Sequence, residues 1–282
     1  MSDTPAPPSP AMLSAARLAE AFGEPPDAMI VLGSGLSPLR ARLRGATPPV
    51  PYAQLGLPTP GVHGHGGEAV LGQLGEARVL LMSGRVHAYE GRALEEVVRA
   101  TRAAGLWGAK RLIFTAAVGS TRRELVPGTL VRLTDHINLT GLNPLRGPND
   151  DRLGPRFPDI SAAYNPVLGA HLDEALAASG GPWSRGVYCW TGGPSYESPA
   201  EVRMVALLGG DLVGMSTVPE VIAGAQLGLR MGAVAVVSNL GAGLAEEPLT
   251  HEDVTRVVGE AADRLGHALT LALAADLRAA GG

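Results

Sequence analysis

The sequence predicts an α/β sandwich built on a central mixed, mainly parallel β-sheet. Short apolar runs alternate with helical patterns along most of the 282 residues, which is typical of strands that alternate with helices. The composition agrees, since 45% hydrophobic and 18% charged residues can bury a substantial core. Polar residues follow several of the apolar runs, and in this fold class ligands bind beyond the carboxyl ends of the strands. The same pattern therefore indicates where a binding site should lie.

The expected elements follow one another in a regular order. Residues 1–10 are polar and rich in proline, which predicts a disordered N-terminal arm, and residues 11–22 are expected to form a helix. The apolar runs that predict strands cover residues 28–32, 77–82, 111–115, 129–133, 185–190, 212–215 and 233–238. Between Val254 and Leu269, apolar residues recur at a spacing of three and four, which predicts a last helix with one buried stripe. Since we find no internal repeat and no linker, residues 11–282 are expected to form one domain.

The composition argues against several classes of function. Lys and Arg number 23 against 27 Asp and Glu, a net charge of −4, and no basic block could neutralise a run of phosphates, so nucleic acid is not an expected partner. No apolar run reaches the length of a membrane span and the first residues lack the pattern of a secretory signal, so we expect a cytoplasmic protein. Cys189 is the one cysteine and the histidines are scattered, so neither a disulfide nor a metal site is expected.

Two polar clusters suit an anion. The turn GSG at residues 33–35 follows the first strand and offers backbone N–H groups and the Ser34 hydroxyl, although an ordinary tight turn explains it equally well. Arg85 and His87 follow the second strand two positions apart, which in an extended chain places both side chains on one face. A guanidinium fork suits phosphate and an imidazole can donate to it. We therefore favour an anion site over a surface salt bridge beside a packed histidine.

Three further polar residues stand at strand ends and leave alternatives open. Ser216 precedes a helix that opens near Pro219, where serine is also a common N-terminal residue. The Asn239 amide offers a donor and an acceptor, which suits the edge of a heterocycle, but a turn asparagine can also bond its own backbone. Glu197 follows GGPSY at the end of a strand. An unpaired carboxylate in a sheltered cleft is costly, so Glu197 either faces water or accepts hydrogen bonds.

Eight sequence blocks resemble those of the trimeric purine nucleoside phosphorylases, in that family's order and from about residue 31 to residue 254. They read GSGLSPL, GHGGEAVLG, GRVHAYEGR, DHINLTGLNPLRGPND, RFPDIS, GGPSYESPAEVR, VGMSTVPEVIAGAQLGLRMG and SNLGAG. The resemblance implies a single-domain, three-layer α/β/α phosphorylase fold and a homotrimer. It also implies a purine salvage reaction without a cofactor, in which a purine (deoxy)ribonucleoside and the co-substrate phosphate give the free base and the sugar 1-phosphate.

The same resemblance assigns roles to individual residues. The residues implied to bind phosphate are Ser34, Arg85, His87 and Ser216, with the backbone at Ala117. Those implied to hold the purine are Glu197 and Asn239, with Tyr196 stacked on it. Those implied to lie near the ribose are Tyr89, Met215, His65 and His251, with Phe157 reaching over from a neighbouring subunit. Within this set, His87, Asn239 and Glu197 are expected to act in catalysis.

The choice of base is expected to depend on Glu197 and Asn239. A 6-oxopurine presents an N1–H donor and guanine adds a 2-amino group, and one carboxylate can accept both bonds, so inosine and guanosine are the expected substrates. Residues 115–120 read TAAVGS, where the family usually has TNAAGG, and this block leans toward the related methylthioadenosine phosphorylases. Relatives that act on 6-aminopurines usually carry aspartate in place of Asn239, which favours 6-oxopurines.

Three other functions remain as alternatives. One is a methylthioadenosine phosphorylase. Another is a non-catalytic nucleoside-binding homologue, suggested by Ala116 in place of the family's asparagine. A nucleoside hydrolase is the third, and it would leave the cluster of Arg85, His87 and serines unexplained.

Overall fold

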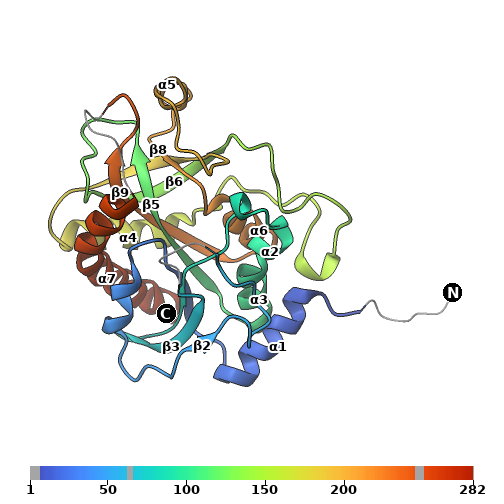
Figure 1. Ribbon diagram of the computed structural model, residues 1–282. Coiled ribbons are helices and arrows are strands. Elements are labelled where there is room, and N and C mark those ends of the chain that lie inside the picture. The colour runs from blue at the N-terminus through green and yellow to red at the C-terminus, as the bar shows by residue number, and fades with distance from the viewer. Residues whose placement is uncertain (1–6, 62–65, 245–250, 282) are drawn as a thin grey trace.

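The computed structural model describes residues 7–61, 66–244 and 251–281 (Figure 1). The strands are β1 (Ala28–Val31), β2 (Val50–Pro51), β3 (Glu68–Leu74), β4 (Ala77–Ser83), β5 (Arg111–Ser120), β6 (Leu130–Asn138), β7 (Trp183–Trp190), β8 (Leu212–Gly214) and β9 (Arg230–Leu240). The α-helices are α1 (Pro10–Phe22), α2 (Leu94–Val97), α3 (Arg99–Trp107), α4 (Pro166–Ala178), α5 (Pro199–Leu207), α6 (Val218–Gln226) and α7 (His251–Gly281). Short 3₁₀ helices are η1 (Ser37–Arg42), η2 (Ala88–Glu90) and η3 (Asp151–Leu153).

All seven predicted strands are present, and two further strands were not predicted. The strands β2 and β3 pair with each other in antiparallel register, and β3 also pairs with β4. The chain passes from β3 to β4 through a two-residue turn, since Leu74 pairs with Ala77 and Gly75 has a φ of 64°. The sequence does not reveal this hairpin, because only Gly75 and Glu76 separate its two apolar segments. The edge strand β2 is only two residues long and lies where the sequence predicted no strand.

The sheet is mixed. The strand order is β2-β3-β4-β1-β5-β8-β7-β6-β9. The pairings β1–β4, β1–β5, β5–β9, β6–β7 and β7–β8 are parallel, whereas β2–β3, β3–β4, β5–β8 and β6–β9 are antiparallel. Because β5 pairs with both β8 and β9, the strands β5, β8, β7, β6 and β9 form a closed ring. The parallel prediction is therefore right for the centre of the sheet, and the ring was not anticipated.

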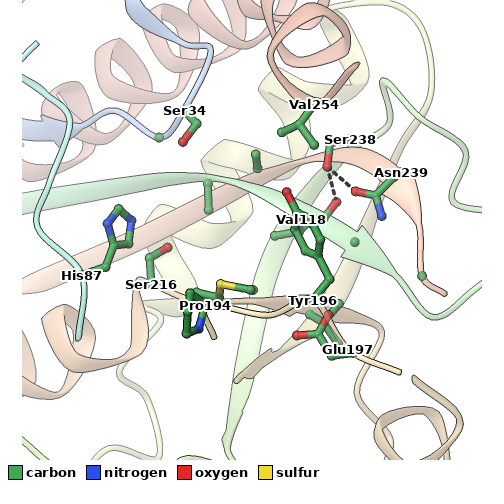
Figure 2. A pocket seen from close by; sticks show the side chains of 18 of the residues that line it. Ser34, His87, Val118, Pro194, Tyr196, Glu197, Ser216, Ser238, Asn239 and Val254 are labelled. Atoms are coloured by element: carbon green, nitrogen blue, oxygen red, sulfur yellow. Dashed lines mark hydrogen bonds between the residues drawn. The ribbon is translucent and has the colours of Figure 1, made fainter. Parts of the chain in front are cut away.

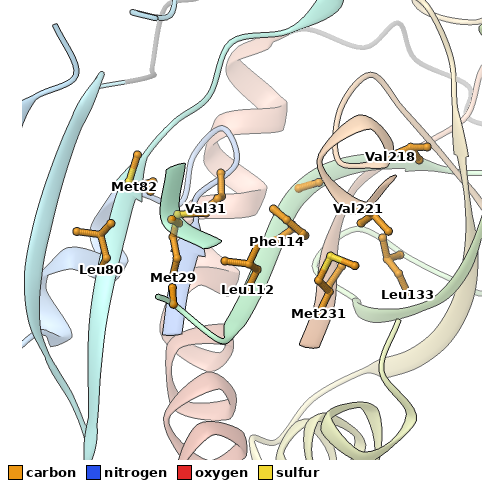
Figure 3. Packing of buried hydrophobic residues seen from close by; sticks show 14 of the residues in the cluster. Met29, Val31, Leu80, Met82, Leu112, Phe114, Leu133, Val218, Val221 and Met231 are labelled. Carbon is orange, nitrogen blue, oxygen red and sulfur yellow. The ribbon is translucent and has the colours of Figure 1, made fainter. Parts of the chain in front are cut away.

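Helices pack on both faces of the sheet. Met29 and Ile30 are neighbours on β1 whose side chains point to opposite faces, and they belong to different hydrophobic clusters. The cluster with Met29 includes apolar residues of α1, α3 and α6, and Figure 3 shows part of it, including Val221 of α6. The cluster with Ile30 includes apolar residues of α4 and α7. Figure 1 shows the same division, with α4 and α7 on one side and α1, α3 and α6 on the other.

The N-terminal helix begins one residue earlier than predicted. Its first residue is Pro10, and the Ser9 hydroxyl accepts a hydrogen bond from the Met12 N–H at 3.3 Å. Serine before proline at the first helical position is a favourable start, because the proline nitrogen has no hydrogen to satisfy. Residue 10 of the predicted disordered arm is therefore helical, and residues 1–6 of that arm lie outside the described residues.

A buried ion cluster joins α7 to the amino-terminal ends of β5 and β9. The Asp276 carboxylate, whose side chain has no exposed surface, accepts from Arg111 Nε at 2.5 Å and from Arg230 Nη1 at 3.0 Å. Burial opposes ionisation of Asp276, but the hydrogen bonds from the two arginines outweigh it and lower its pKa. The Arg111 side chain is only 9% exposed, and the Asp276 carboxylate is the counter-ion that balances its charge.

We expect Asp276→Asn to lower the free energy of unfolding by about 3 kcal/mol, because it leaves the buried Arg111 charge without its counter-ion. Denaturant unfolding at one fixed protein concentration measures this loss. Glu76→Gln is the matched control, since Glu76 meets Arg278 in an exposed ion pair at 3.4 Å and its loss should cost under about 1 kcal/mol. Equal losses in the two variants would contradict the role given to Asp276.

Candidate active site

A cavity of about 590 Å³ opens at the carboxyl ends of the central strands, within the usual size of small-molecule sites. Ten of the thirteen residues that the sequence singled out line it. They are Ser34, Arg85, His87, Tyr89, Ala117, Tyr196, Glu197, Met215, Ser216 and Asn239. These residues lie in six different strands or in the segments that follow them, so the sheet gathers them from across the sequence. The polar residues that the sequence singled out at strand ends therefore line one cavity.

The three remaining residues lie elsewhere or outside the described part. His65 falls outside the described residues, and so does the side chain of His251, the first residue of α7. Phe157 lies between β6 and α4, is 88% exposed and has the Arg156 guanidinium 5.7 Å from its ring centroid. It does not line the cavity of its own chain.

The Arg85 side chain is fixed by hydrogen bonds to three elements. Its Nη2 donates to the carbonyl oxygen of Val31, the last residue of β1, at 3.1 Å. It also donates to the carbonyl oxygen of Thr115 in β5 at 2.7 Å. Its Nη1 donates to the hydroxyls of Ser216 and Thr217, both at 3.2 Å. Because Arg85 is 5% exposed, these contacts replace the water that a guanidinium would otherwise bind.

Glu220 lies behind Arg85 and was not predicted. Its carboxylate is 3.3 Å from Arg85 Nη1 and is 3% exposed. Burial raises the pKa of Glu220, although Arg85 and the Thr217 N–H oppose the rise. Thr217 has a φ of 67°, the one positive φ among the non-glycine residues that the structure describes, and it precedes α6 directly. Strain of this kind is typical of functional sites where surrounding contacts hold the backbone.

His87 is held in place by Glu90 and Tyr89. The Glu90 carboxylate accepts from the His87 N–H at 2.7 Å and lies 3.1 Å from its Nδ1, and it also accepts from Gly61 N–H at 2.7 Å. The rings of His87 and Tyr89 stack with centroids 4.8 Å apart. Burial, together with the nearby Arg85 charge, lowers the pKa of His87 to about 4 despite Glu90. His87 is therefore neutral near pH 7, and its ring can donate one hydrogen bond and accept another.

The glycine turn after β1 lies against β5. The Gly33 N–H donates to Thr115 Oγ1 at 3.0 Å, and a Cβ at position 33 would come within 2.9 Å of Ala116 Cα. Only glycine allows this approach, which places Ser34 over the cavity. The element that follows is the six-residue 3₁₀ helix η1. Ala116, at the position of the family's asparagine, is buried beneath this turn.

The Glu197 carboxylate accepts a hydrogen bond from within the protein. The Thr191 hydroxyl donates to Glu197 Oε1 at 2.6 Å, and Glu197 is half-buried where the chain passes from β7 to α5. Thr191 directly follows Trp190, the last residue of β7, and no motif in the sequence pointed to it. Tyr196, beside Glu197, is 53% exposed and lines the mouth of the cavity.

Polar groups of two kinds occupy different parts of the cavity. Figure 2 shows Ser34, His87 and Ser216 together on one side, with Glu197 and Asn239 on the other. The first group, with Arg85, offers cationic and hydroxyl donors that suit an oxyanion. The second offers an acceptor and an amide that suit the edge of a heterocycle.

In the described ranges, no group of three or more His, Cys, Asp or Glu side chains could hold a metal ion. Among the helices of the described part, none is long and apolar enough to cross a membrane.

Comparison with known proteins agrees with this geometry. The model of the phosphorylase superfamily matches residues 27–274. Purine nucleoside phosphorylase 1 of Geobacillus stearothermophilus is 42% identical over 84% of this chain and 86% of its own length. The purine nucleoside phosphorylase of Mycobacterium tuberculosis is 42% identical over 85% of this chain and 86% of its own.

Solved structures share the fold. The crystal structure of Schistosoma mansoni purine nucleoside phosphorylase in complex with adenosine has a TM-score of 0.87 and 32% identity, and the alignment covers 93% of this chain and 95% of that one. A structure of Schistosoma mansoni purine nucleoside phosphorylase with inosine also has a TM-score of 0.87, with 31% identity over 94% and 95% of the two chains. The present chain therefore belongs to the phosphorylase superfamily and, within it, to the purine nucleoside phosphorylases.

Proposed function

We propose that this chain catalyses the reversible phosphorolysis of purine (deoxy)ribonucleosides, with a preference for 6-oxopurines such as inosine and guanosine. The observation that carries the proposal is the pairing, in one cavity, of the donor cluster around Arg85 with the carboxylate of Glu197 and the amide of Asn239. Relatives named purine nucleoside phosphorylase, and solved neighbours with inosine, guanosine and adenosine, support the substrate class. The preference among purines rests on the chemistry of the site itself.

In this proposal inorganic phosphate is the co-substrate and no cofactor takes part. Phosphate binds to the hydroxyls of Ser34 and Ser216, to Arg85 and His87, and to the backbone at Ala117. The close contacts of Arg85 with Ser216, with the end of β1 and with Thr115 in the middle of β5 support this assignment, because they hold the donors in place before phosphate arrives. Neutral His87, whose Nδ1 hydrogen points to the Glu90 carboxylate, can accept the hydrogen of a protonated phosphate oxygen at Nε2.

The sugar would lie between the two polar groups, beside Tyr89 and Met215, with His65 and His251 near its 5′-hydroxyl. Cleavage of the glycosidic bond places positive charge on the ribose and negative charge on the departing purine. Phosphate beneath the sugar then stabilises the cation and afterwards attacks it, so that no covalent enzyme intermediate is needed. Catalysis in this scheme comes from alignment and from stabilisation of both charges.

The base would be held by Glu197 and Asn239, with Tyr196 stacked on it. Glu197 can accept from the N1–H of a 6-oxopurine and from the 2-amino group of guanine, which gives the half-buried carboxylate strong partners in addition to Thr191. Asn239 can donate to O6 or N7 and thereby stabilise the negative charge of the leaving base. A 6-aminopurine offers no N1–H, so it leaves Glu197 without that partner.

We also propose a homotrimer of single, three-layer α/β/α domains that serves purine salvage in the cytoplasm. The exposed aromatic ring of Phe157 supports the trimer, because such a large apolar surface is stabilised when a neighbouring subunit covers it. In the trimer, Phe157 of one subunit would cover the ribose of the next. The two hydrophobic clusters on opposite faces of the sheet support the three layers.

A methylthioadenosine phosphorylase is the alternative that a specific feature favours. Residues 115–120 read TAAVGS, and this segment contributes Ala116, Ala117 and Val118 to the cavity. Against it stands Asn239, which presents an amide where an acceptor for a 6-amino group would be needed.

The first test is the phosphate-dependent release of free base from nucleosides. We expect the kcat/KM for inosine and guanosine to exceed that for adenosine and methylthioadenosine by about tenfold or more, the worth of one charge-assisted hydrogen bond. Coupled spectrophotometric assays with and without phosphate measure it. A preference for adenosine or methylthioadenosine would overturn the proposed preference. Cleavage without phosphate would indicate a hydrolase, and binding without turnover a non-catalytic homologue.

Asn239→Asp should shift the preference toward adenosine, because a carboxyl oxygen can accept from a 6-amino group where the amide donates. We expect the adenosine-to-inosine ratio of kcat/KM to rise about tenfold or more. Steady-state kinetics on both nucleosides give the ratio, and Asn239→Ala is the control, since it removes donor and acceptor together. An unchanged ratio in Asn239→Asp would count against the role given to Asn239.

The lowered pKa of His87 should make stability depend on pH. In the unfolded chain histidine binds a proton below its ordinary pKa of 6.5, whereas folded His87 stays neutral until about pH 4, so stability falls as the pH drops through this window. Between pH 7 and 4.5 the loss from this one group is about 2.5 kcal/mol. Denaturant unfolding of His87→Gln at both pH values should show a loss smaller by that amount. Ser216→Ala, which changes the same cavity without a titrating group, should keep the loss seen in the wild type.

A further inference from the structure

Asn239 can present either a donor or an acceptor to a base, and its surroundings decide which. The amide Nδ2 donates to the Leu240 carbonyl oxygen at 3.0 Å, while Oδ1 lies 2.6 Å from the Ser238 hydroxyl oxygen. A carbonyl oxygen only accepts, so the amide atom that faces Leu240 must be the nitrogen. The amide oxygen therefore faces Ser238, as Figure 2 shows.

The Ser238 hydroxyl has one hydrogen and two acceptors within reach. The Val118 carbonyl oxygen is 3.0 Å away and Asn239 Oδ1 is 2.6 Å away. Two oxygens 2.6 Å apart need a hydrogen between them, so the hydroxyl donates to Asn239. Ser238 is 5% exposed, which leaves little water to compete for this bond. Asn239 Oδ1 thus faces Ser238 and accepts from it, and the second hydrogen of Nδ2 is the donor that the amide can offer to a ligand.

A β-bulge brings these two side chains together. In the pairing of β5 with β9, Val118 pairs with Val237 and Gly119 pairs with Asn239, so Ser238 is an extra residue in β9. Successive side chains of a regular strand point to opposite faces, and a bulge changes this alternation. Gly119 leaves room for the amide, because a Cβ there would lie 3.3 Å from Asn239 Nδ2.

We propose that Ser238 is a specificity-determining residue, which rests on the proposed function: by donating to the oxygen of Asn239 it holds the amide in the orientation that offers the second N–H of Nδ2 to the base. A 6-oxopurine accepts at O6 and N7 and matches this donor, whereas the 6-amino group of adenine is itself a donor and does not. Without the Ser238 hydroxyl, one of the two bonds that hold this orientation is lost, so the amide can turn its oxygen to the base and serve both kinds of purine.

The test compares Ser238→Thr with Ser238→Val, two side chains of nearly equal volume that differ in the hydroxyl. Steady-state kinetics with inosine and adenosine give the ratio of kcat/KM. We expect the inosine-to-adenosine ratio of Ser238→Thr to stay within about twofold of wild type, and that of Ser238→Val to fall about five- to tenfold, the worth of one hydrogen bond. Calorimetric binding of hypoxanthine and adenine should show the same change.

Equal losses on both nucleosides in Ser238→Val, with an unchanged ratio, would show a merely structural role and overturn the inference. If Ser238→Val does not fold, Ser238→Ala removes the same hydroxyl with less change in shape and is judged by the same ratio. The proposed function has its own readout in the wild-type chain. Wild-type protein that neither cleaves nor binds purines would overturn both, whereas an active wild type with a ratio insensitive to the hydroxyl would overturn only the role of Ser238.

Discussion

The burial of the Arg85 guanidinium is the constraint on which the rest of the site depends. A buried charge is costly unless it is paired and hydrogen-bonded, and Arg85 meets this requirement with partners from the end of β1, from β5 and from the residues before α6. The same bonds fix the distance between these elements. They also bring Ser216 next to Arg85, and they help to hold Thr217 at its positive φ. The oxyanion side of the cavity is therefore built before any ligand binds.

Glu220 changes the charge of that side. A carboxylate 3.3 Å from Arg85 offsets much of the guanidinium charge, so the field in the cavity is weaker than Arg85 alone would give. His87 adds no charge near neutral pH, because burial and Arg85 lower its pKa. Under the proposed function, phosphate is then held mainly by directed hydrogen bonds from hydroxyls, backbone and Arg85. Such binding suits a chain whose net charge of −4 cannot attract anions as a whole.

The sequence predicted the parts of the site that depend on local pattern. Arg85, His87, Ser216 and Asn239 stand at the carboxyl ends of recognisable apolar runs, and the sheet places such ends together. It did not predict Glu220, because a glutamate in the first turn of α6 has a sufficient local explanation as a helix N-terminal residue. The role of Ser238 depends on a one-residue shift between β5 and β9, and the closure of the ring depends on β5 pairing on both edges. Register and closure are properties of strands distant in sequence, so local periodicity does not reveal them.

The two sides of the cavity differ in the contacts that hold their polar groups. The donors around Arg85 lie in buried strand ends, and Asn239 is held by Ser238 and Leu240 on β9. Glu197 instead stands on the segment between β7 and α5, where the Thr191 hydroxyl is its protein partner and the adjacent Tyr196 is half exposed. Under the proposed function, the base would meet an amide held by two neighbours on β9 and a carboxylate held by one threonine hydroxyl. Recognition of the base would then depend on other groups than the alignment of phosphate, which the reaction also needs.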